Sequence, residues 1–243
     1  PVIGEYGIKL DRGVTRHPVQ PYLVYNLNEE APPNGSPEVV KYMAKHVPFD
    51  GGETKSFDEL AKKALGSELL GCLKADVDNL GLLFSHGLRG EKQSNVSVSR
   101  IATMSRMLET FFSGWVERML STPKYKDCYT VYSGGDDLLI VGPWNIMVDL
   151  AEEINENFQR FTAQNPGITL SAGFGLFKPR FPVDSAVEMT ERMLEDAKEK
   201  PNPETGVSRS QITALGQTMN WRQYRVACQE GKRLYRWIAE KRI

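Results

Sequence analysis

The chain contains 243 residues, of which 40% are apolar and 25% are charged, and its formal net charge is −1. This composition is typical of one or two globular domains with a sizeable core, and the near-neutral charge excludes an overall basic field that would attract nucleic acid by itself. No apolar run reaches about 18 residues, so no membrane-spanning helix is expected, and no signal peptide is recognisable.

The cysteines are few and far apart, at Cys72, Cys128 and Cys228. They form no CxxC pair and no zinc-binding pattern, and an odd, sparse set of this kind fits a reducing compartment, so a cytoplasmic protein is expected. The chain starts at Pro1 rather than at methionine and ends within a helical pattern, which favours a fragment excised from a longer protein.

Residues 1–65 are predicted to form a lead-in that wraps the main domain. The segment is rich in proline and contains a strand-like piece at residues 21–25 and a turn at residues 50–52. Ser36 followed by Pro37 predicts the start of a short helix, and Ser56 before an acidic turn predicts the start of another.

The main domain is predicted at residues 66–216, where apolar patterns alternate between the strand and helix periods. The expected strands run from residue 68 into acidic residues near 76, then over 128–132, 138–141, 168–177 and 211–215. The expected helices cover about residues 97–120, 144–162 and 184–200. Residues 217–243 are expected to begin a C-terminal helical region, whose alternating basic and apolar residues favour packing against a partner or a missing domain.

The order of these elements is β-α-β-β-α-β, followed by a helix and a short strand. This order predicts an α+β fold of the ferredoxin-like type, with an antiparallel sheet and helices on one face. In that topology the first strand of the domain lies next to the central hairpin, although the two are far apart in the sequence.

The central hairpin contains the stretch of greatest chemical interest, residues 132–140 (YSGGDDLLI). Gly134 and Gly135 lie between two strand-like runs and mark a tight turn, since glycine accepts a positive φ without steric cost. Asp136 and Asp137 follow directly, and two adjacent carboxylates repel each other unless a cation joins them. An ordinary surface turn is the alternative interpretation, because Gly and Asp are common turn residues.

Upstream, Asp76 and Asp78 stand two residues apart at the end of the first predicted strand, so their side chains are expected on one face. The alternative is a strand end capped by solvated aspartates. With the hairpin beside this strand, four carboxylates would meet at one sheet edge, and oxygen-only ligands suit Mg²⁺ or Mn²⁺. Two such ions can align a 3′-hydroxyl, an α-phosphate and a leaving pyrophosphate, so metal-dependent nucleotidyl transfer is predicted.

The same stretches carry a resemblance to known proteins. The motifs are residues 73–81 (LKADVDNLG), 97–106 (SVSRIATMSR), 132–138 (YSGGDDL), 169–177 (TLSAGFGLF) and 191–198. The sequence resembles the palm domain shared by nucleotide cyclases, GGDEF diguanylate cyclases and palm polymerases. It more closely resembles the GGDD-bearing palm of the large subunit of type III-A (Csm) CRISPR effector complexes, over roughly residues 38–215.

The resemblance implies synthesis of cyclic oligoadenylate from ATP, switched on when the complex binds target RNA. It implies that Asp76, Asp136 and Asp137 are catalytic and, with the backbone carbonyl of Val77, hold two Mg²⁺ or Mn²⁺ ions. The nucleotide-binding residues that it implies are Asp78, Asn79, Leu80, Gly81, Leu82, Ser133, Gly134, Gly135 and Lys198. For Lys198, a solvated lysine at a helix end is the alternative.

The partners implied by the resemblance are other Csm-type subunits, guide RNA, target RNA and a first palm domain that is missing from this chain. The HD nuclease domain and the cysteine-rich zinc-binding region of the family's large subunit are not in this sequence either, so neither function is assigned. Two rival interpretations are a diguanylate cyclase and a non-catalytic palm that binds RNA or subunits. The first is disfavoured because the signature is GGDDL rather than GGDEF and no RxxD element precedes it; the second is disfavoured by the retained carboxylates.

Overall fold

The structure of the protein is a computed structural model that describes residues 2–3, 6–7, 24–27, 38–41, 43–84 and 98–240. The chain divides into two compact units, Pro1–Lys41 and Tyr42–Ile243. In the first unit, β1 (Val2–Ile3) pairs antiparallel with β2 (Tyr6–Gly7), and β3 (Val24–Leu27) pairs parallel with β4 (Glu38–Lys41).

The helix predicted to start at Pro37 is wrong, because residues 38–41 form strand β4. Val39 and Val40 are β-branched and prefer extended backbone, and pairing with β3 supplies partners for their backbone groups. The strand-like piece predicted at residues 21–25 overlaps β3, and its first residues lie outside the described part of the chain.

The second unit begins with a small hairpin and a capped helix. Strands β5 (Phe49–Asp50) and β6 (Glu53–Thr54) are joined by two glycines with positive φ, which confirms the predicted turn. Helix α1 (Phe57–Ala61) begins after Ser56, whose side chain accepts a hydrogen bond from the Glu59 N–H while the Glu59 carboxylate accepts one from the Ser56 N–H. This reciprocal cap confirms the helix start predicted at Ser56.

A six-stranded sheet organises the second unit. Its strands are β7 (Leu70–Val77), β8 (Tyr129–Gly134), β9 (Asp137–Pro143), β10 (Leu170–Phe177), β11 (Gln211–Ala214) and β12 (Gln217–Asn220), and their order across the sheet is β12-β11-β10-β7-β9-β8. All neighbours are antiparallel except β10 and β11. Because β7 lies between β10 and β9, with β8 outside, the predicted ferredoxin-like arrangement of four strands is confirmed.

The helices also follow the prediction. They are α2 (Leu80–Leu82), α3 (Val98–Glu109), the π-helical segment η2 (Thr110–Trp115), α4 (Val116–Leu120), α5 (Trp144–Phe161), α6 (Val183–Glu199) and α7 (Trp221–Ala239). Segments α3, η2 and α4 form one continuous helix, as expected for residues 97–120, but its π-helical turn was not predicted. There, the Ser113 hydroxyl donates to the Glu109 carbonyl at 2.5 Å, a side-chain bond that competes with the α-helical pattern.

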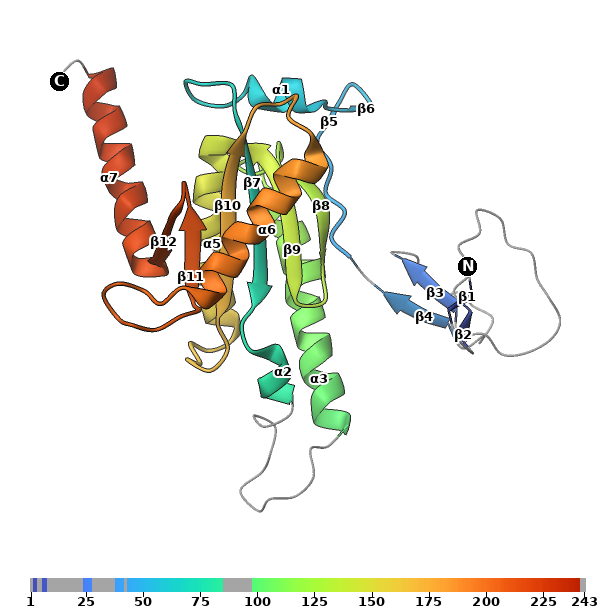
Figure 1. Cartoon of the computed structure of the whole chain (residues 1–243). Helices are drawn as coiled ribbons and strands as arrows, with labels where there is room; N and C mark the ends of the chain where they lie inside the picture. The colour runs from blue at the N-terminus through green and yellow to red at the C-terminus, as the bar shows by residue number, and fades with distance from the viewer. Residues whose placement is uncertain are drawn as a thin grey trace. The chain divides into compact units, whose positions relative to one another are not determined.

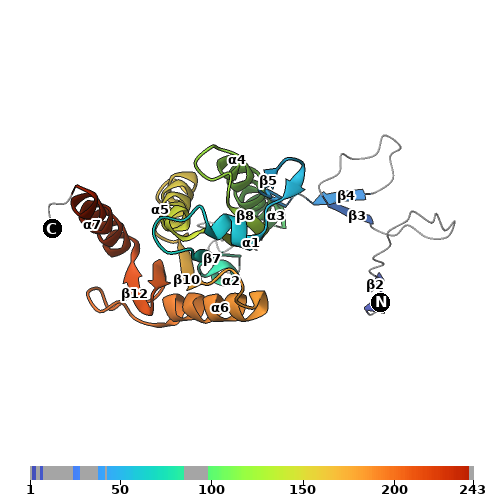
Figure 2. The ribbon, with the colours of Figure 1, turned by 90° about the horizontal axis from the view of Figure 1, so that it is seen from above.

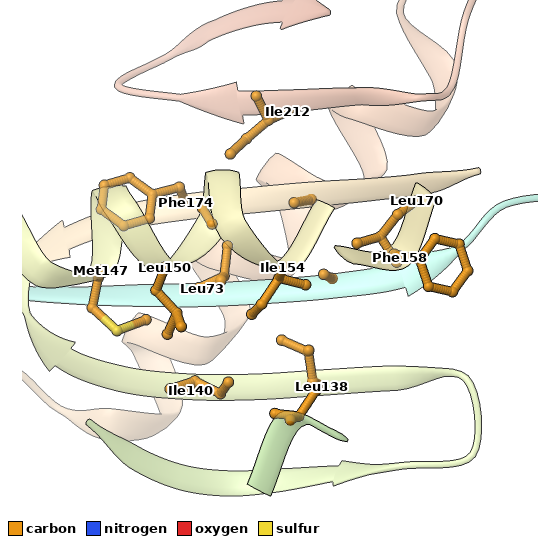
Figure 3. Close-up of a cluster of buried hydrophobic side chains, with 14 of the residues drawn as sticks. Leu73, Leu138, Ile140, Met147, Leu150, Ile154, Phe158, Leu170, Phe174 and Ile212 are labelled. Atoms are coloured by element: carbon orange, nitrogen blue, oxygen red, sulfur yellow. The ribbon is translucent and has the colours of Figure 1, made fainter. Parts of the chain in front are cut away.

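Helices cover both faces of the sheet (Figures 1 and 2). Within the βαββαβ unit, η2, α4 and α5 pack on one face, as expected, and α6, which follows that unit, packs with α1 on the other. In the main core, side chains of α5 lie against side chains of the strands, as Figure 3 shows for Met147, Leu150, Ile154, Phe158, Leu73, Leu138, Ile140, Leu170 and Phe174. Both faces of β7 and β9 are therefore buried over most of their length.

The residues before β7 protect an edge of this sheet. The Ala44 N–H donates to the Ser133 carbonyl and the Thr130 N–H donates to the His46 carbonyl, both at 2.9 Å, so the outer edge of β8 is partly covered. Leu60 of α1 is fully buried against the sheet. The compact unit thus begins at Tyr42, inside the segment expected to be a lead-in.

Strand β12 was not predicted. It pairs with β11 through a turn in which Leu215 and Gly216 both have positive φ. Two left-handed central residues are the mark of a tight hairpin, but leucine is a rare choice for the first of them, so the sequence signal was weak. No helix in residues 43–84 or 98–240 is both long enough and apolar enough to cross a membrane.

Replacing Gly173 of β10 by alanine is expected to destabilise the second unit strongly. A Cβ at this position would lie 2.3 Å from the Thr190 carbonyl oxygen and 2.6 Å from the Leu194 nitrogen, both in the backbone of α6. Because α6 would have to move away from the sheet, the free energy of unfolding in urea should fall by about 3 kcal/mol or more.

The matched control is Gly231→Ala in the exposed part of α7, where nothing lies within 4 Å of the new Cβ. This variant should keep its stability or gain up to about 1 kcal/mol, since alanine favours helix over glycine. An unchanged stability of Gly173→Ala would contradict the close packing of α6 on β10.

Candidate active site

Three carboxylate residues meet where β7 ends and the β8–β9 hairpin turns. Asp76 lies directly opposite Asp137 in the β7–β9 ladder, and the Val77 N–H donates to the Asp136 carbonyl at 3.1 Å. Gly135 has φ +72° and forms the turn, and a Cβ added to it would meet nothing within 4 Å. The predicted proximity of the first strand and the central hairpin is therefore confirmed.

Strand alternation gives this site its polar neighbours. Lys74 and Asp76 share the face of β7 that α6 covers, and α6 supplies a partner for each of them. The Lys74 ammonium is paired with Glu191, and the Lys198 ammonium is paired with Asp76. The Asp76 and Lys198 side chains keep 26% and 24% of their surfaces exposed, so this ion pair remains accessible from solvent.

The carboxyl group of Asp76 is electrostatically strained. Burial raises the pKa of Asp76 above its ordinary value, and the negative charges of Asp136 and Asp78 raise it further. The hydrogen bond and positive charge of Lys198 act in the opposite direction and lower this pKa. A neighbouring cation therefore favours the ionised form of Asp76.

Asp137 has a similar environment with a different partner. Burial raises the pKa of Asp137, the Tyr132 hydroxyl donates a hydrogen bond that lowers it, and the charge of Asp76 raises it again. Burial also raises the pKa of Tyr132, so the phenol remains protonated and acts as the donor. The Lys74 ammonium lies 5.8 Å from the centroid of the Tyr132 ring, on the same side of the sheet.

Asp78 does not join this carboxylate cluster, contrary to the prediction. It is 1% exposed, and its two oxygens accept hydrogen bonds from the hydroxyls of Thr169 and Ser171 and from the Ser210 N–H, at 2.7, 2.8 and 3.0 Å. Ser171 lies on β10, Thr169 directly precedes that strand and Ser210 directly precedes β11, on the side of β7 opposite the hairpin. The Asp78 N–H is used as well, by the Thr169 carbonyl. Its side chain ties three elements together, so a direct contact between it and nucleotide is not supported.

Ser133 also differs from the prediction. Its side chain is fully buried, and its hydroxyl donates to the Phe112 carbonyl of the π-helical segment at 2.6 Å. Because Ser133 lies opposite Leu138, its side chain shares the core face of the hairpin rather than the face with Asp137. Its role in the described structure is to join β8 to η2.

The other predicted nucleotide-binding residues are accessible. Asn79 has φ 56° and precedes the short helix α2, and Gly81 and Leu82 are exposed beside the end of β7. Leu80 is half-buried against the main core. Gly134 lies opposite Asp137 and Gly135 forms the turn, so both border the carboxylates. Whether these residues contact a nucleotide stays a prediction.

The donor set fits a divalent cation of the Mg²⁺ or Mn²⁺ type. Asp76, Asp136, Asp137 and the backbone of Val77 offer only oxygen ligands, and the raised pKa values of Asp76 and Asp137 show that this group of charges favours an added positive charge. Within residues 43–84 and 98–240, no three His, Cys, Asp or Glu side chains already converge as ligands of one ion. Binding would therefore require side chains to turn, with Lys198 leaving Asp76.

Sequence reasoning missed three polar residues of this site, Lys74, Tyr132 and Glu191. The first two could have been found from strand alternation, since Lys74 stands two residues before Asp76. The position of Glu191 on α6 follows only from the way that helix crosses the sheet.

The chain is similar to known proteins in both sequence and fold. The family described as Cas10/Cmr2, second palm domain, matches residues 69–205. A curated relative from Methanocaldococcus jannaschii, named CRISPR system single-strand-specific deoxyribonuclease Cas10/Csm1 (subtype III-A), is 37% identical over 222 residues, which cover 81% of this chain and 27% of the relative. The protein of the same name from Mycobacterium tuberculosis is 35% identical over 63% of this chain and 20% of its own length.

Solved structures give the same result. A crystal structure of a Csm1-Csm4 cassette in complex with one ATP matches with a TM-score of 0.68 and 27% identity, covering 83% of this chain and 30% of that one. A Csm1-Csm4 cassette in complex with cA4 matches with a TM-score of 0.68 and 25% identity, covering 82% of this chain and 30% of that one. The chain thus spans less than a third of the length of these relatives.

Ser133→Ala is expected to weaken the fold without changing the affinity of the folded protein for nucleotide. The Phe112 carbonyl would lose its buried hydroxyl donor, which should cost about 1–3 kcal/mol in urea unfolding. Titration with ATP and Mn²⁺ well below the unfolding transition should give the wild-type affinity, and the exposed Ser67→Ala variant should change neither quantity. Tight binding that depends on the Ser133 hydroxyl would restore the original prediction.

Asp137→Asn is expected to raise the melting temperature at pH 7 in the absence of divalent ions. Because the pKa of Asp137 is higher in the folded than in the unfolded state, the folded state holds the proton more tightly. Protonated Asp137 therefore stabilises the folded wild type at low pH, and this stabilisation is lost as the pH rises through the folded pKa. The amide of the variant does not titrate, so its stability lacks this dependence. The difference between the two proteins should vanish below about pH 4, the ordinary carboxyl range.

The measurement is thermal unfolding over a pH series, with the exposed Asp184→Asn of α6 as the matched control. An Asp137→Asn variant that melts below the wild type at pH 7 would contradict the strained environment assigned to this carboxylate.

Proposed function

Because this chain belongs to the family of the Cas10/Cmr2 second palm domain, we propose that it is the catalytic palm of a nucleotidyltransferase that makes cyclic oligoadenylate from ATP. The observation that carries the proposal is the pairing of Asp76 with Asp137 at the GGDD hairpin, next to the Lys198 ammonium. Relatives that this chain resembles have been solved with ATP and with cA4, which supports the same substrate and product here.

The carboxylates would hold the divalent ions that this chemistry needs. Asp76, Asp136 and Asp137, with the carbonyl of Val77, are the ligands that we propose. Bound Mg²⁺ or Mn²⁺ would supply a Lewis acid that neutralises charge on the reacting phosphate. Lys198 would then be released from Asp76 and would be close enough to contact the triphosphate.

The rest of the nucleotide site is proposed on the two segments that border the carboxylates. The backbone N–H groups of residues 79–82 would face the triphosphate, and the absence of side chains at Gly134 and Gly135 would let the nucleotide approach the hairpin closely. The 3′-hydroxyl of one adenylate would attack the α-phosphorus of the next ATP, and pyrophosphate would leave. Asp137, whose pKa is raised by burial, would accept the hydroxyl proton.

The partners are proposed on the same basis. Several of the matching structures are Csm1-Csm4 assemblies, which supports other Csm-type subunits as partners of this chain. Guide RNA, target RNA and a first palm domain are proposed from the family resemblance, with residues 66–216 as the palm and the cytoplasm as its location. The deoxyribonuclease named in the curated relatives is not included, because this chain spans 27% and 20% of those proteins.

The double variant Asp136→Ala, Asp137→Ala tests this proposal. Reconstituted with partner subunits and target RNA, the wild type should convert ATP into oligoadenylate and pyrophosphate in the presence of Mn²⁺, as read by mass spectrometry. The double variant should lose at least about 100-fold in rate, because it lacks the charge that organises the reacting groups. Asp184→Ala, which removes an exposed carboxylate from α6, should keep the wild-type rate.

Two outcomes would contradict the proposal. Formation of cyclic diguanylate from GTP in place of oligoadenylate from ATP would make the protein a diguanylate cyclase. A complex that assembles on RNA but makes no product from either nucleotide would leave the palm as a binding scaffold.

A further inference from the structure

A groove of about 920 Å³ lies between the loop that precedes β11 and the first turns of α7. We call it the arginine groove and define it by Asn202, Arg209, Ser210, Gln211, Arg222 and Val226. Its volume is in the range of sites that bind ligands of nucleotide size or larger. None of the residues assigned to the candidate active site lines it.

The arginine groove is joined to the candidate active site through backbone contacts. The Ser210 N–H donates to the Asp78 carboxylate at 3.0 Å, and Asp78 is two residues from Asp76. The Arg209 N–H donates to the carbonyl of Ala197 at 3.3 Å, next to the lysine that pairs with Asp76. The groove therefore begins at the same end of the sheet as the carboxylates.

Arg209 and Ser210 have an unusual backbone. Their φ angles are 73° and 51°, so two consecutive non-glycine residues occupy the left-handed region. This conformation is costly for side chains with a Cβ, and nearby Gly206, with φ 68°, shows the residue usually chosen for it.

The charges of the groove are available to a ligand. Its lining contains two arginines and one carboxylate, that of Glu204. Neither Arg209 nor Arg222 has an ion-pair partner among the side chains that the structure describes, and Arg222 is exposed. A second hollow, of about 410 Å³ between α5 and α7, differs because Lys124 and Lys232 there are paired with Glu153 and Asp149.

Gln211 adds a neutral hydrogen-bonding group to the same lining. The residue is 1% exposed, and its side-chain N–H group donates to the carbonyls of Ala197 and Lys200. Its Oε1 atom has no hydrogen-bond partner among the described residues.

We propose that the arginine groove binds the phosphodiester backbone of a short single-stranded oligonucleotide. Its two guanidinium groups supply donors for phosphate oxygens, since arginine binds phosphate in a two-pronged geometry. Resting on the proposed function, the ligand is the growing oligoadenylate, whose 3′ end would lie at Asp76 and Asp137. The groove would then retain intermediates between successive additions.

The test is the binding of a fluorescent 5′-triphosphorylated triadenylate to this chain, measured over a series of salt concentrations. Arg209→Gln and Arg222→Ala should each weaken binding about tenfold and lower the slope of log affinity against log salt by about 0.7, the value for one phosphate contact on a single strand. Binding of ATP with Mn²⁺ should remain at the wild-type level in Arg222→Ala. Arg236→Ala, which removes an exposed arginine from α7 outside the groove, is the matched control and should bind the triadenylate normally.

The variant Arg209→Gly distinguishes the loss of a ligand contact from a loss of folding stability. Glycine accepts the left-handed conformation, so this variant should melt at the wild-type temperature or above it while binding triadenylate as weakly as Arg209→Gln. Wild-type affinity for triadenylate in both Arg209→Gln and Arg222→Ala would contradict oligonucleotide binding in the groove. An equal loss of affinity in Arg236→Ala would contradict it as well. Neither result would contradict the proposed function. Arginine-dependent binding in a complex that makes no oligoadenylate would keep the groove as an oligonucleotide site and overturn the proposed function instead.

Discussion

The antiparallel pairing of β7 with β9 is the constraint on which the rest of the structure depends. It places Asp76 opposite Asp137, an arrangement that the two carboxylates oppose by mutual repulsion and loss of hydration. Like charges about 4 Å apart near a protein surface repel by roughly 1–4 kcal/mol, whereas each fully buried leucine or isoleucine contributes about 1.5–3 kcal/mol. Leu73, Leu138, Leu139 and Ile140 are all fully buried beside the carboxylates, so packing fixes the register and the repulsion is retained.

Helix α6 completes the site because it crosses the sheet at very short range. Gly173 lets the backbone of α6 approach β10, and the helix then delivers the ammonium of Lys198 to Asp76 and the carboxylate of Glu191 to Lys74. The result is a row of alternating charges on one face of the sheet. Under the proposed function, a divalent ion would compete with Lys198 for the Asp76 carboxylate.

Asp78 links this chemistry to the opposite half of the sheet. Its buried carboxylate joins the end of β7 to β10 and to the turn at Arg209 and Ser210. The arginine groove is therefore linked to the proposed catalytic carboxylates through Asp78, which lies two residues from Asp76 along the chain. In this proposal the carboxylates form the phosphodiester bond, and the arginine groove binds the oligoadenylate product of that step.

The sequence by itself determined the βαββαβ order of the main domain, the GGDD turn and the meeting of Asp76 with that turn, because apolar periodicity and glycine geometry are local properties of the chain. It did not determine the directions of Asp78 and Ser133, which look like parts of the site in the sequence but point to β10 and to η2. Strand β4, strand β12 and the π-helical turn were also missed. Only the tertiary structure decided these, because a polar side chain near a surface has several possible partners, and which one it meets depends on elements that are distant in the chain.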